Sequence, residues 1–306
     1  MKDLRKLLAP LSIILFSVIV FSSCKKDDPV VTPPKDITVV ATENGSFTKL
    51  VAALAKVDLV KTLQGDGPYT VFAPNDAAFG KVDLSATSND DLKATLLYHV
   101  LGAKVLAADI KTGQTEVGSA GGPKLYISKN ANGVFINGNS KVIATDVAAS
   151  NGVIHVLDNV LTVPKNTIAG IVAGDPKNFS TLLSLVKTAG LADVLSSPTI
   201  GYTVFAPTDA AFTELFKTVN PATLTVAQIK QILLYHVVPS RVFSPELANG
   251  DVTMADDNKS KVTIDLTNGA TVKGVGNTVA SKITAANIMA TNGVIHVIDR
   301  VLLPKL

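Results

Sequence analysis

The sequence predicts an α+β protein that contains two tandem copies of one unit. YTVFAPNDAAF at 69–79 returns as YTVFAPTDAAF at 202–212, and NGVIHVLDNVL at 151–161 returns as NGVIHVIDRVL at 292–302. In each copy, segments with helical periodicity come first and short β-rich segments follow. This segregation favours an α+β fold over a parallel α/β sheet.

The helices of each copy are predicted from apolar spacing and from capping patterns. An apolar residue recurs at i, i+3, i+4 and i+7 in both copies, at Phe47, Leu50, Val51 and Leu54 and again at Phe179, Leu182, Leu183 and Val186. A later helix in each copy ends in LLYHV and begins near Ser88 or Thr225, where the sequence is close to a capping box.

The strands follow these helices and are separated by Gly and Asn turns. They read KLYIS, GVFIN, KVIATD and GVIHVLD in the first copy, and KVTIDLT, ATVKG, TVASKIT and GVIHVID in the second. The boundary falls just past the last strand of the first copy, near Pro164–Thr167. We therefore expect one domain at residues 37–165 and another at residues 166–306.

Each residue of the repeated YTVFAP box has a predicted folding role. TVFA is a short apolar strand that Pro74 ends, Asn75 caps the next helix, and Asp76 places a negative charge in its first turn. Pro74 and Phe79 occupy the hydrophobic-staple positions. The second copy has Pro207, Thr208, Asp209 and Phe212 at the same places. We interpret the box as structural rather than catalytic.

Two boxes and an intervening Tyr-His pair occur in the same order in both copies. T-V-F-A-P-[NT]-D-A-A-F, the pair, and N-G-V-I-H-V-[LI]-D-x-V-L resemble the signature motifs of the fasciclin (FAS1) domain family. The resemblance covers nearly the whole chain after residue 36. It implies two tandem domains, each a β-wedge or sandwich with helices packed against it, and extracellular roles in adhesion, matrix attachment and surface protein contact.

The same resemblance implies candidate interaction residues. In animal adhesion members, the Tyr-His region and an Asp-Ile pair before the second box are implicated in receptor binding. These positions correspond to Tyr98, His99, Tyr235 and His236, and to Asp146 and Val147. The second copy has Asn287 in place of the acid. Because an amide cannot replace a carboxylate that completes a receptor's metal site, we expect no integrin-like binding by the second copy.

The histidines are the residues that could suggest a metal or acid–base centre. His99, His155, His236 and His296 all lie in the repeated motifs, and imidazole titrates near neutral pH. Each lies in an apolar run, where histidine more often bonds a backbone carbonyl. Asp158 follows His155 by three positions and points to the opposite face of a regular strand, and Asp299 is its counterpart.

Motifs for catalysis are absent from the sequence. It contains no H-E-x-x-H, no G-x-S-x-G and no phosphate-binding loop, since GSAGG at 118–122 lacks the following Lys and reads as a hairpin loop. We expect no enzyme activity, no cofactor and no bound metal. A histidine-centred metal site is the rival hypothesis.

The start of the chain has the pattern of an export signal. In residues 1–23, a basic start precedes a fifteen-residue, mostly apolar run that is short for a bilayer span. The run ends at FSSC, which resembles a bacterial lipobox, so Cys24, the only cysteine, is the predicted acylation site and bilayer anchor. A plain signal peptide or a buried thiol is the alternative.

Residues 24–36 are charged and then Pro-rich, which predicts a stalk. Their Cys-Lys-Lys-Asp-Asp start resembles the surface-export signals of Bacteroidetes lipoproteins. Export and anchoring together lead us to expect a position on the outer membrane, exposed at the cell surface.

Charge and aromatic content narrow the class of partner. Without residues 1–23 the chain has 25 basic and 24 acidic residues, a net charge of +1, and no basic run, which argues against nucleic acid. The chain has no Trp, and Tyr126 is the only tyrosine outside the repeated motifs, so a stacking platform for sugars is poor. We expect contact with a cell-surface or matrix protein, with a polysaccharide- or small-ligand-binding module as the alternative.

Overall fold

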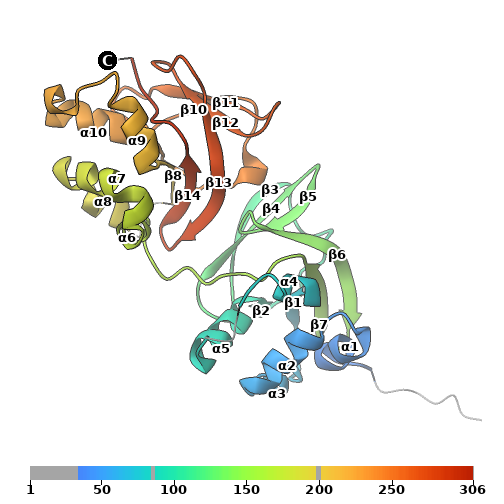
Figure 1. Ribbon diagram of the computed structural model, residues 1–306. Coiled ribbons are helices and arrows are strands. Elements are labelled where there is room, and N and C mark those ends of the chain that lie inside the picture. The colour runs from blue at the N-terminus through green and yellow to red at the C-terminus, as the bar shows by residue number, and fades with distance from the viewer. Residues whose placement is uncertain (1–33, 84–86, 198–200, 306) are drawn as a thin grey trace, which may run out of the picture. The chain divides into compact units, whose positions relative to one another are not determined.

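The computed structural model describes residues 34–83, 87–197 and 201–305 (Figure 1). The predicted leader, the lipidation site Cys24 and most of the predicted stalk therefore lie outside the described residues. Residues 34–306 form one compact unit. Within the described ranges, no helix combines the length and the apolar character that crossing a bilayer requires.

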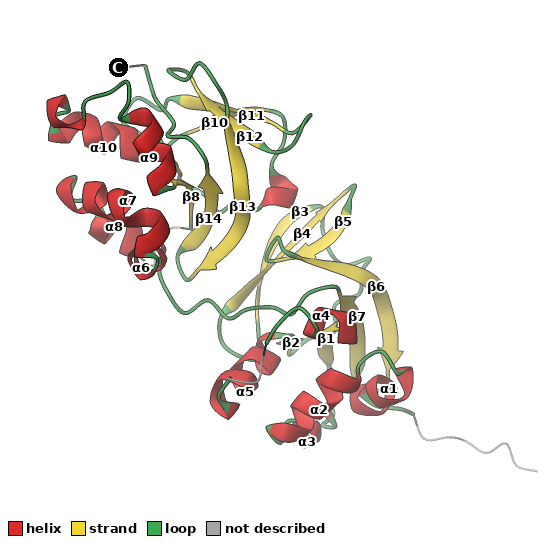
Figure 2. Ribbon diagram, viewed as in Figure 1, coloured by secondary structure: helices red, strands yellow, loops and turns green. Residues whose placement is uncertain are grey.

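The first domain begins with helices and ends with strands (Figure 2). Its first part contains α1 (Ile37–Asn44), α2 (Thr48–Lys56), α3 (Val60–Leu63), β1 (Tyr69–Pro74), α4 (Asp76–Phe79), α5 (Asn89–Tyr98) and β2 (Val100–Leu101). Its second part contains β3 (Gly113–Gly118), β4 (Lys124–Asn130), β5 (Gly133–Ile136), β6 (Ser140–Ala149) and β7 (Gly152–Leu157).

The second domain repeats this order. Its first part contains α6 (Ile168–Gly174), α7 (Pro176–Thr188), α8 (Ala192–Ser196), β8 (Tyr202–Pro207), α9 (Asp209–Leu215), the 3-10 turn η1 (Pro221–Thr223), α10 (Val226–Leu234) and β9 (Val237–Val238). Its second part contains the 3-10 turn η2 (Ser244–Glu246), β10 (Gly250–Thr253), β11 (Lys261–Asp265), β12 (Thr271–Gly274), β13 (Ser281–Ala290) and β14 (Gly293–Ile298).

Each domain contains a seven-stranded sheet, and the two sheets share one topology. The strand order is β2-β1-β7-β6-β5-β4-β3 in the first domain and β9-β8-β14-β13-β12-β11-β10 in the second. The two signature boxes pair directly with each other as parallel strands, with Tyr69 opposite Gly152 in the first domain and Tyr202 opposite Gly293 in the second. The other strand pairs are antiparallel, so the α+β class is confirmed.

The box strands separate two hydrophobic cores, which explains their unbroken apolar sequence. Successive side chains of a strand point to opposite faces. Val71 and Ala73 pack in a core with the helices, whereas Phe72 packs in a second core with strands β4 and β5. In the second domain, Val204 and Ala206 likewise pack in the core with the helices, and Phe205 packs in the other core. The helix-covered, folded-over sheet is the wedge or sandwich that the sequence motifs implied.

The predicted caps of the YTVFAP box are confirmed. The Asn75 side chain accepts a hydrogen bond from Ala78 N, and Thr208 accepts one from Ala211 N. The aspartate after each cap has a further role that the sequence did not show, because its partners lie in another helix. Asp76 accepts from Thr48 N and Lys49 N at 3.2 and 2.8 Å, and so caps α2 from outside that helix.

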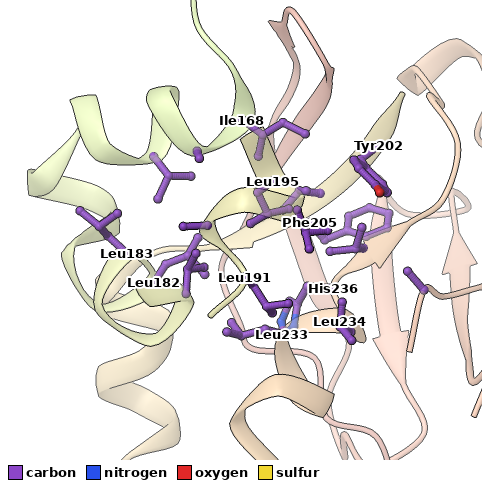
Figure 3. A pocket seen from close by; sticks show the side chains of 18 of the residues that line it. Ile168, Leu182, Leu183, Leu191, Leu195, Tyr202, Phe205, Leu233, Leu234 and His236 are labelled. Atoms are coloured by element: carbon purple, nitrogen blue, oxygen red, sulfur yellow. The ribbon is translucent and has the colours of Figure 1, made fainter. Parts of the chain in front are cut away.

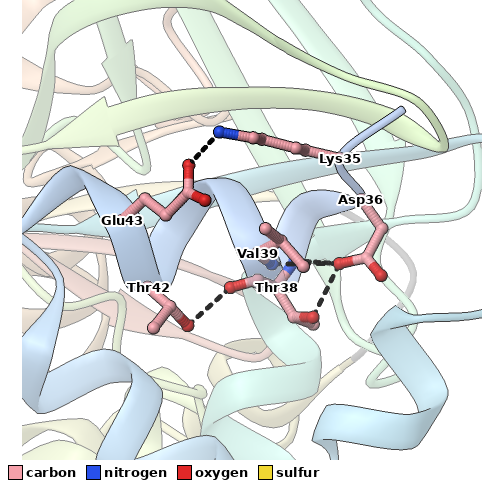
Figure 4. A network of polar contacts seen from close by, with 6 residues as sticks. All are labelled: Lys35, Asp36, Thr38, Val39, Thr42 and Glu43. Carbon is pink, nitrogen blue, oxygen red and sulfur yellow. Dashed lines mark hydrogen bonds and ion pairs between the residues drawn. The ribbon is translucent and has the colours of Figure 1, made fainter. Parts of the chain in front are cut away.

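The first helix starts where the predicted stalk ends. Asp36 caps α1 by accepting hydrogen bonds from Thr38 N and Val39 N at 2.8 and 3.0 Å (Figure 4). Lys35 forms an ion pair with Glu43 on the same helix. These contacts fix the position at which the chain enters the first domain.

Some element boundaries differ from the sequence prediction. The LLYHV segments leave the helix before their last residues, since β2 starts at Val100 and β9 at Val237. Strands β3 and β10 were not predicted, because they are edge strands with mostly exposed residues and lack apolar alternation. GSAGG does form the turn between β3 and β4, as expected.

Candidate functional site

The Tyr-His pairs lie inside the domains. Tyr98 and Tyr235 are completely buried. The Tyr98 hydroxyl donates to Lys124 O and accepts from Asn137 Nδ2, both at 2.9 Å, and the Tyr235 hydroxyl donates to Lys261 O at 2.5 Å. Burial raises the pKa of Tyr98 to about 12. The hydrogen bond from Asn137 lowers this pKa, but by less than burial raises it. These tyrosines therefore join the end of a helix to a strand.

His99 and His236 are each held as a neutral imidazole. His99 Nδ1 donates to Thr95 O at 2.7 Å, and its Nε2 accepts from Leu161 N at 2.9 Å. His236 makes the matching bonds to Ile232 O and Leu302 N. Complete burial lowers the pKa of both histidines to about 4, against the raising effect of the carbonyl bond. The ring connects the helix to the last residue of the second box.

His155 and His296 connect different parts of the domain with the opposite ring orientation. His155 Nε2 donates to Val105 O at 2.8 Å, and its Nδ1 accepts from Asp146 N at 3.3 Å. His296 makes the same pair of bonds with Val242 O and Asn287 N. Burial lowers the pKa of His296. The prediction that the histidines bond backbone carbonyls is confirmed for all four.

The signature aspartates also serve the backbone. Asp158 accepts a hydrogen bond from Lys141 N at 2.8 Å, and Asp299 accepts one from Lys282 N at 2.7 Å. Across the described ranges, no group of three or more His, Cys, Asp or Glu side chains is arranged to hold a metal ion.

Burial changes what the interaction candidates can do. A partner does not reach Tyr98, His99, Tyr235 or His236 in this structure, because each is at most 2% exposed. Their part in an interaction stays a prediction and would have to act through the surrounding surface. Val147 is half-buried in strand β6 and packs on the helical core. Asp146 alone is exposed.

Asp146 lies in a bulge of β6 with an unusual backbone conformation. The register of β6 against β7 shifts between Ala144 and Val147, and Asp146 has a φ of 58°. Asn287 occupies the same bulge in β13 with a φ of 60°. Asp and Asn tolerate this left-handed region better than other side chains, which explains the choice of residue.

Hydrogen bonds show that the surroundings of Asp146 and Asn287 correspond. Ala107 N donates to Asp146 Oδ1 as Ser244 N donates to Asn287 Oδ1. The preceding residue of each loop also donates to an acid: Leu106 N donates to Asp109, and Phe243 N donates to Glu246. The two domains therefore present the same face.

In the second domain, this face is covered by the first domain. Asn287 Nδ2 lies 3.1 Å from Gly138 O and 3.0 Å from Asn139 Oδ1, and Asn287 is only 3% exposed. An aspartate here would place a carboxylate against a carbonyl oxygen. The amide is needed as a donor, which gives a physical reason for the loss of the acid in the second copy.

Side chains around Asn287 complete the contact between the domains. The Arg241 guanidinium lies 4.4 Å from the centre of the Tyr126 ring, and the Phe243 ring lies 5.8 Å from it. Glu246 accepts hydrogen bonds from Gln114 Nε2 and Ser128 Oγ. Asn130 Nδ2 donates to Pro245 O at 2.6 Å. Strand β4 of the first domain thus packs on the turn η2 of the second.

In the first domain, the corresponding face is exposed. We call it the Asp146 face and define it by Lys104, Leu106, Asp109 and Asp146, all of which are exposed. Leu106 is 37% exposed, whereas its counterpart Phe243 is completely buried. Lys104, Leu106 and Asp109 of this face therefore correspond in charge and polarity to Arg241, Phe243 and Glu246 of the second domain.

The sequence motifs identified one residue of this face and missed the others. Lys104, Leu106 and Asp109 lie in a loop without regular spacing, so no periodicity marks them. A signal was present in the comparison of the copies. The loop after LLYHV keeps a cation, an apolar residue and an acid at matched positions, although Ala107 and Ala108 are replaced by Ser244 and Pro245.

Comparison with known sequences identifies the family. The Fasciclin domain family matches residues 45–164 and 177–304, well over half of the chain. This chain belongs to the Fasciclin domain family. The two matched ranges lie within the domains predicted at 37–165 and 166–306.

Relatives of these Fasciclin domains come from bacteria and animals. Protein sll1483 of Synechocystis is 42% identical over 135 residues, which cover 42% of this chain and 73% of that protein. Periostin of Homo sapiens is 30% identical over 273 residues, 88% of this chain and 31% of periostin. The transforming growth factor-beta-induced protein ig-h3 of Sus scrofa is 26% identical over 293 residues, 92% of this chain and 41% of ig-h3. The chain thus spans less than half of either animal protein.

A solved structure is similar to the tandem pair of Fasciclin domains. It is a FAS1 domain pair from the insect cell adhesion molecule Fasciclin I. The match covers 85% of this chain and 98% of that chain, with 21% identity and a TM-score of 0.44.

The buried histidines predict a pH-dependent stability of the Fasciclin domains. His99 and His236 have a pKa of about 4 when folded against 6.5 for an unperturbed imidazole. Below pH 6.5 the unfolded chain binds protons that the folded chain does not, so the free energy of unfolding falls until about pH 4. The loss reaches roughly 3 kcal/mol per histidine. Urea unfolding at pH about 7, 6 and 5 measures it.

Variants separate these histidines from other titrating groups. His99→Gln and His236→Gln remove the titration, so stability should depend less on pH in this range. A wild-type unfolding midpoint that stays constant between these pH values contradicts the assignment.

The interface between the Fasciclin domains predicts a steric requirement at Gly138. Its φ is 73°, and an added Cβ would lie 2.7 Å from Phe243 Cβ and 2.8 Å from Asn287 Cγ. We expect Gly138→Ala to separate the domains, at a cost of about 1–3 kcal/mol. Rotational correlation times of the two domains from ¹⁵N relaxation should then fall toward those of single domains.

Gly45→Ala is the matched control for this substitution. Gly45 has a φ of 70°, and a Cβ there meets nothing within 4 Å. The control carries the same backbone strain without the clash, so its domains should tumble as one body. Equal correlation times for both variants would contradict the steric requirement at Gly138.

Proposed function

We propose that this protein is a non-enzymatic envelope lipoprotein whose two Fasciclin domains mediate adhesion or other extracellular protein–protein contact. Membership of the Fasciclin family supports the general role. The solved domain pair that it resembles belongs to a cell adhesion molecule. The more specific assignment, to an anchored bacterial surface protein, depends on the sequence of residues 1–36.

The observation that supports protein contact best is that one face of the fold already binds protein within this chain. The face around Asn287 packs on the first domain through hydrogen bonds and an Arg–Tyr contact. The Asp146 face has the same backbone and similar side chains, but it is exposed. We infer that this face is the contact surface for a partner protein.

The chemistry of the Asp146 face indicates what a partner must present. In the second domain, Glu246 binds hydrogen-bond donors and Arg241 covers a tyrosine ring. Asp109 and Asp146 offer carboxylates to donors, and Lys104 can cover an aromatic ring. A partner with an aromatic side chain flanked by hydroxyl, amide or cationic groups fits these requirements.

The polysaccharide alternative has less support. Tyr126, the only tyrosine outside the repeated motifs, contacts Arg241 and Phe243 in the interface between the domains. Its ring is therefore already used in a protein contact.

The anchor is a proposal from the sequence. Acylation of Cys24 would hold the chain in a bilayer, and residues 24–36 would space the first domain from the membrane. Tandem domains on such a stalk permit avidity when several copies meet one surface.

Substitutions on the Asp146 face test the proposed contact. Asp146→Asn removes the charge and keeps an acceptor for Ala107 N and a residue suited to positive φ. We combine it with Leu106→Ser and coat beads with the variant. Attachment of these beads to protein-coated surfaces should weaken about tenfold or more, since a hydrogen bond to a charged group contributes roughly 1.5–3 kcal/mol.

A carboxylate elsewhere provides the control. Asp66→Asn changes an exposed acid away from this face and should leave attachment unchanged. Bead attachment that is insensitive to the face variants over several protein coatings would refute the contact surface.

Fractionation of cells tests the anchor. The wild-type chain should sediment with the outer membrane, and Cys24→Ala should move to the soluble fraction because the acyl chains are lost. Continued residence of the Cys24→Ala variant in the membrane would exclude lipidation as the anchor.

A further inference from the structure

The second Fasciclin domain contains an apolar cavity of about 260 Å³ (Figure 3). It lies among α6, α7, α8, β8 and the end of α10, at the boundary between the helical layer and the sheet. Its wall includes Ile168, Leu182, Leu191, Leu195, Phe205 and Leu233. An engineered apolar cavity of about 150 Å³ stays dry and binds benzene, so this larger space is suited to a hydrocarbon.

Differences between the two copies help to explain the space. The first domain has Leu54 and Val60 where the second has Val186 and Ala192, and both of these smaller residues line the cavity. Smaller side chains on an unchanged backbone leave a void that the fold only partly closes. At other wall positions the second domain has the larger residue, for example Val172 and Leu183 where the first has Ala41 and Val51, and the cavity persists despite this added volume.

The charged residues at the cavity have one sign. Lys187 in the last turn of α7 and Lys259 in the loop after β10 are the charged side chains that line it, and both are exposed. Neither of them forms an ion pair with a residue of the described ranges. The two lysine side chains are therefore available to an anionic group of a ligand in the cavity.

The imidazole on the wall is not free to bond a ligand. His236 lines the cavity, but its two ring nitrogens already bond Ile232 O and Leu302 N. Apart from His236, the two lysines and Tyr202, the wall is apolar, so a ligand here needs a hydrocarbon body, and the lysines are the groups that can pair with a charged end.

We propose that this cavity binds a small single-chain amphiphile with a carboxylate head group, of the medium-chain fatty acid class. The apolar wall receives the acyl chain, and Lys187 and Lys259 pair with the carboxylate. The volume lies just below the usual range of roughly 300–1,000 Å³ for ligand sites, which favours one short chain over a two-chain lipid. This site is independent of the Asp146 face.

Calorimetric titration of the full chain with decanoate tests the proposal. The wild-type protein should bind one decanoate. The double substitution Val186→Leu/Ala192→Val introduces the residues of the first domain and fills the cavity. It should weaken binding at least about tenfold while the melting temperature stays equal or rises, because filling a cavity usually stabilises a protein.

The head group is tested separately. Lys187→Gln/Lys259→Gln should weaken decanoate binding about 3- to 10-fold and leave decanol binding unchanged, since exposed ion pairs contribute modestly. The control Lys56→Gln/Lys61→Gln changes exposed lysines of the first domain and should affect neither ligand. Equal decanoate binding by the lysine variant and the wild type would overturn the carboxylate assignment.

Further results would overturn the site itself. These are an absence of decanoate binding to the wild type, or equal binding by the wild type and the filled variant. Cavity-dependent binding to phosphatidylglycerol vesicles without binding of decanoate would also overturn it, because the ligand would then be a membrane lipid. Shifts of the Leu182 and Leu195 methyl NMR signals on addition of decanoate locate the ligand without any substitution.

Discussion

The parallel pairing of the two signature boxes is the constraint on which each domain depends. β1 and β7, and likewise β8 and β14, are distant in sequence and adjacent in the sheet. Both faces of these strands are buried, so the apolar run cannot alternate with polar residues as it does in a solvent-facing strand. The alternation of side chains instead assigns Val71 to the helical core and Phe72 to the core inside the sheet.

Polar groups of the same motifs secure this pairing at its ends. His99 bonds the end of α5 to the segment after β7, and His155 bonds β7 to the loop after β2 and to the bulge in β6. Asp76 joins α4 to α2. The strong repetition of these residues follows from a structural requirement: each bonds backbone groups of another segment, and the groups that the histidines bond are wholly or partly buried and would otherwise lack partners.

Duplication let the two domains diverge outside this frame. In the second domain the face around Asn287 is used to hold the first domain, and an amide replaces the acid. In the first domain the same face remains exposed with its carboxylates. The helical layer also differs, because the second domain has a cavity beside β8 that Val186 and Ala192 line, and the first domain has the larger Leu54 and Val60 at these positions. One fold thereby provides a surface in one copy and an interior space in the other.

The sequence alone determined the duplication, the α+β class, the caps at Asn75 and Thr208, and the carbonyl-bonded histidines. The duplication, the class and the caps depend on neighbours within a few residues or on exact repetition, and both can be read from the sequence. The carbonyl bonds of the histidines were expected from the apolar runs around them, although the carbonyls that His155 and His296 bond are distant in sequence. Tertiary structure decided that the Tyr-His pairs are buried, that Asp76 caps a different helix, and that Asn287 lies in an interface while Asp146 does not. These outcomes depend on groups brought together from distant parts of the chain, so no local spacing encodes them. The cavity belongs to the same class, because a void is set by how all its walls pack and not by any one residue.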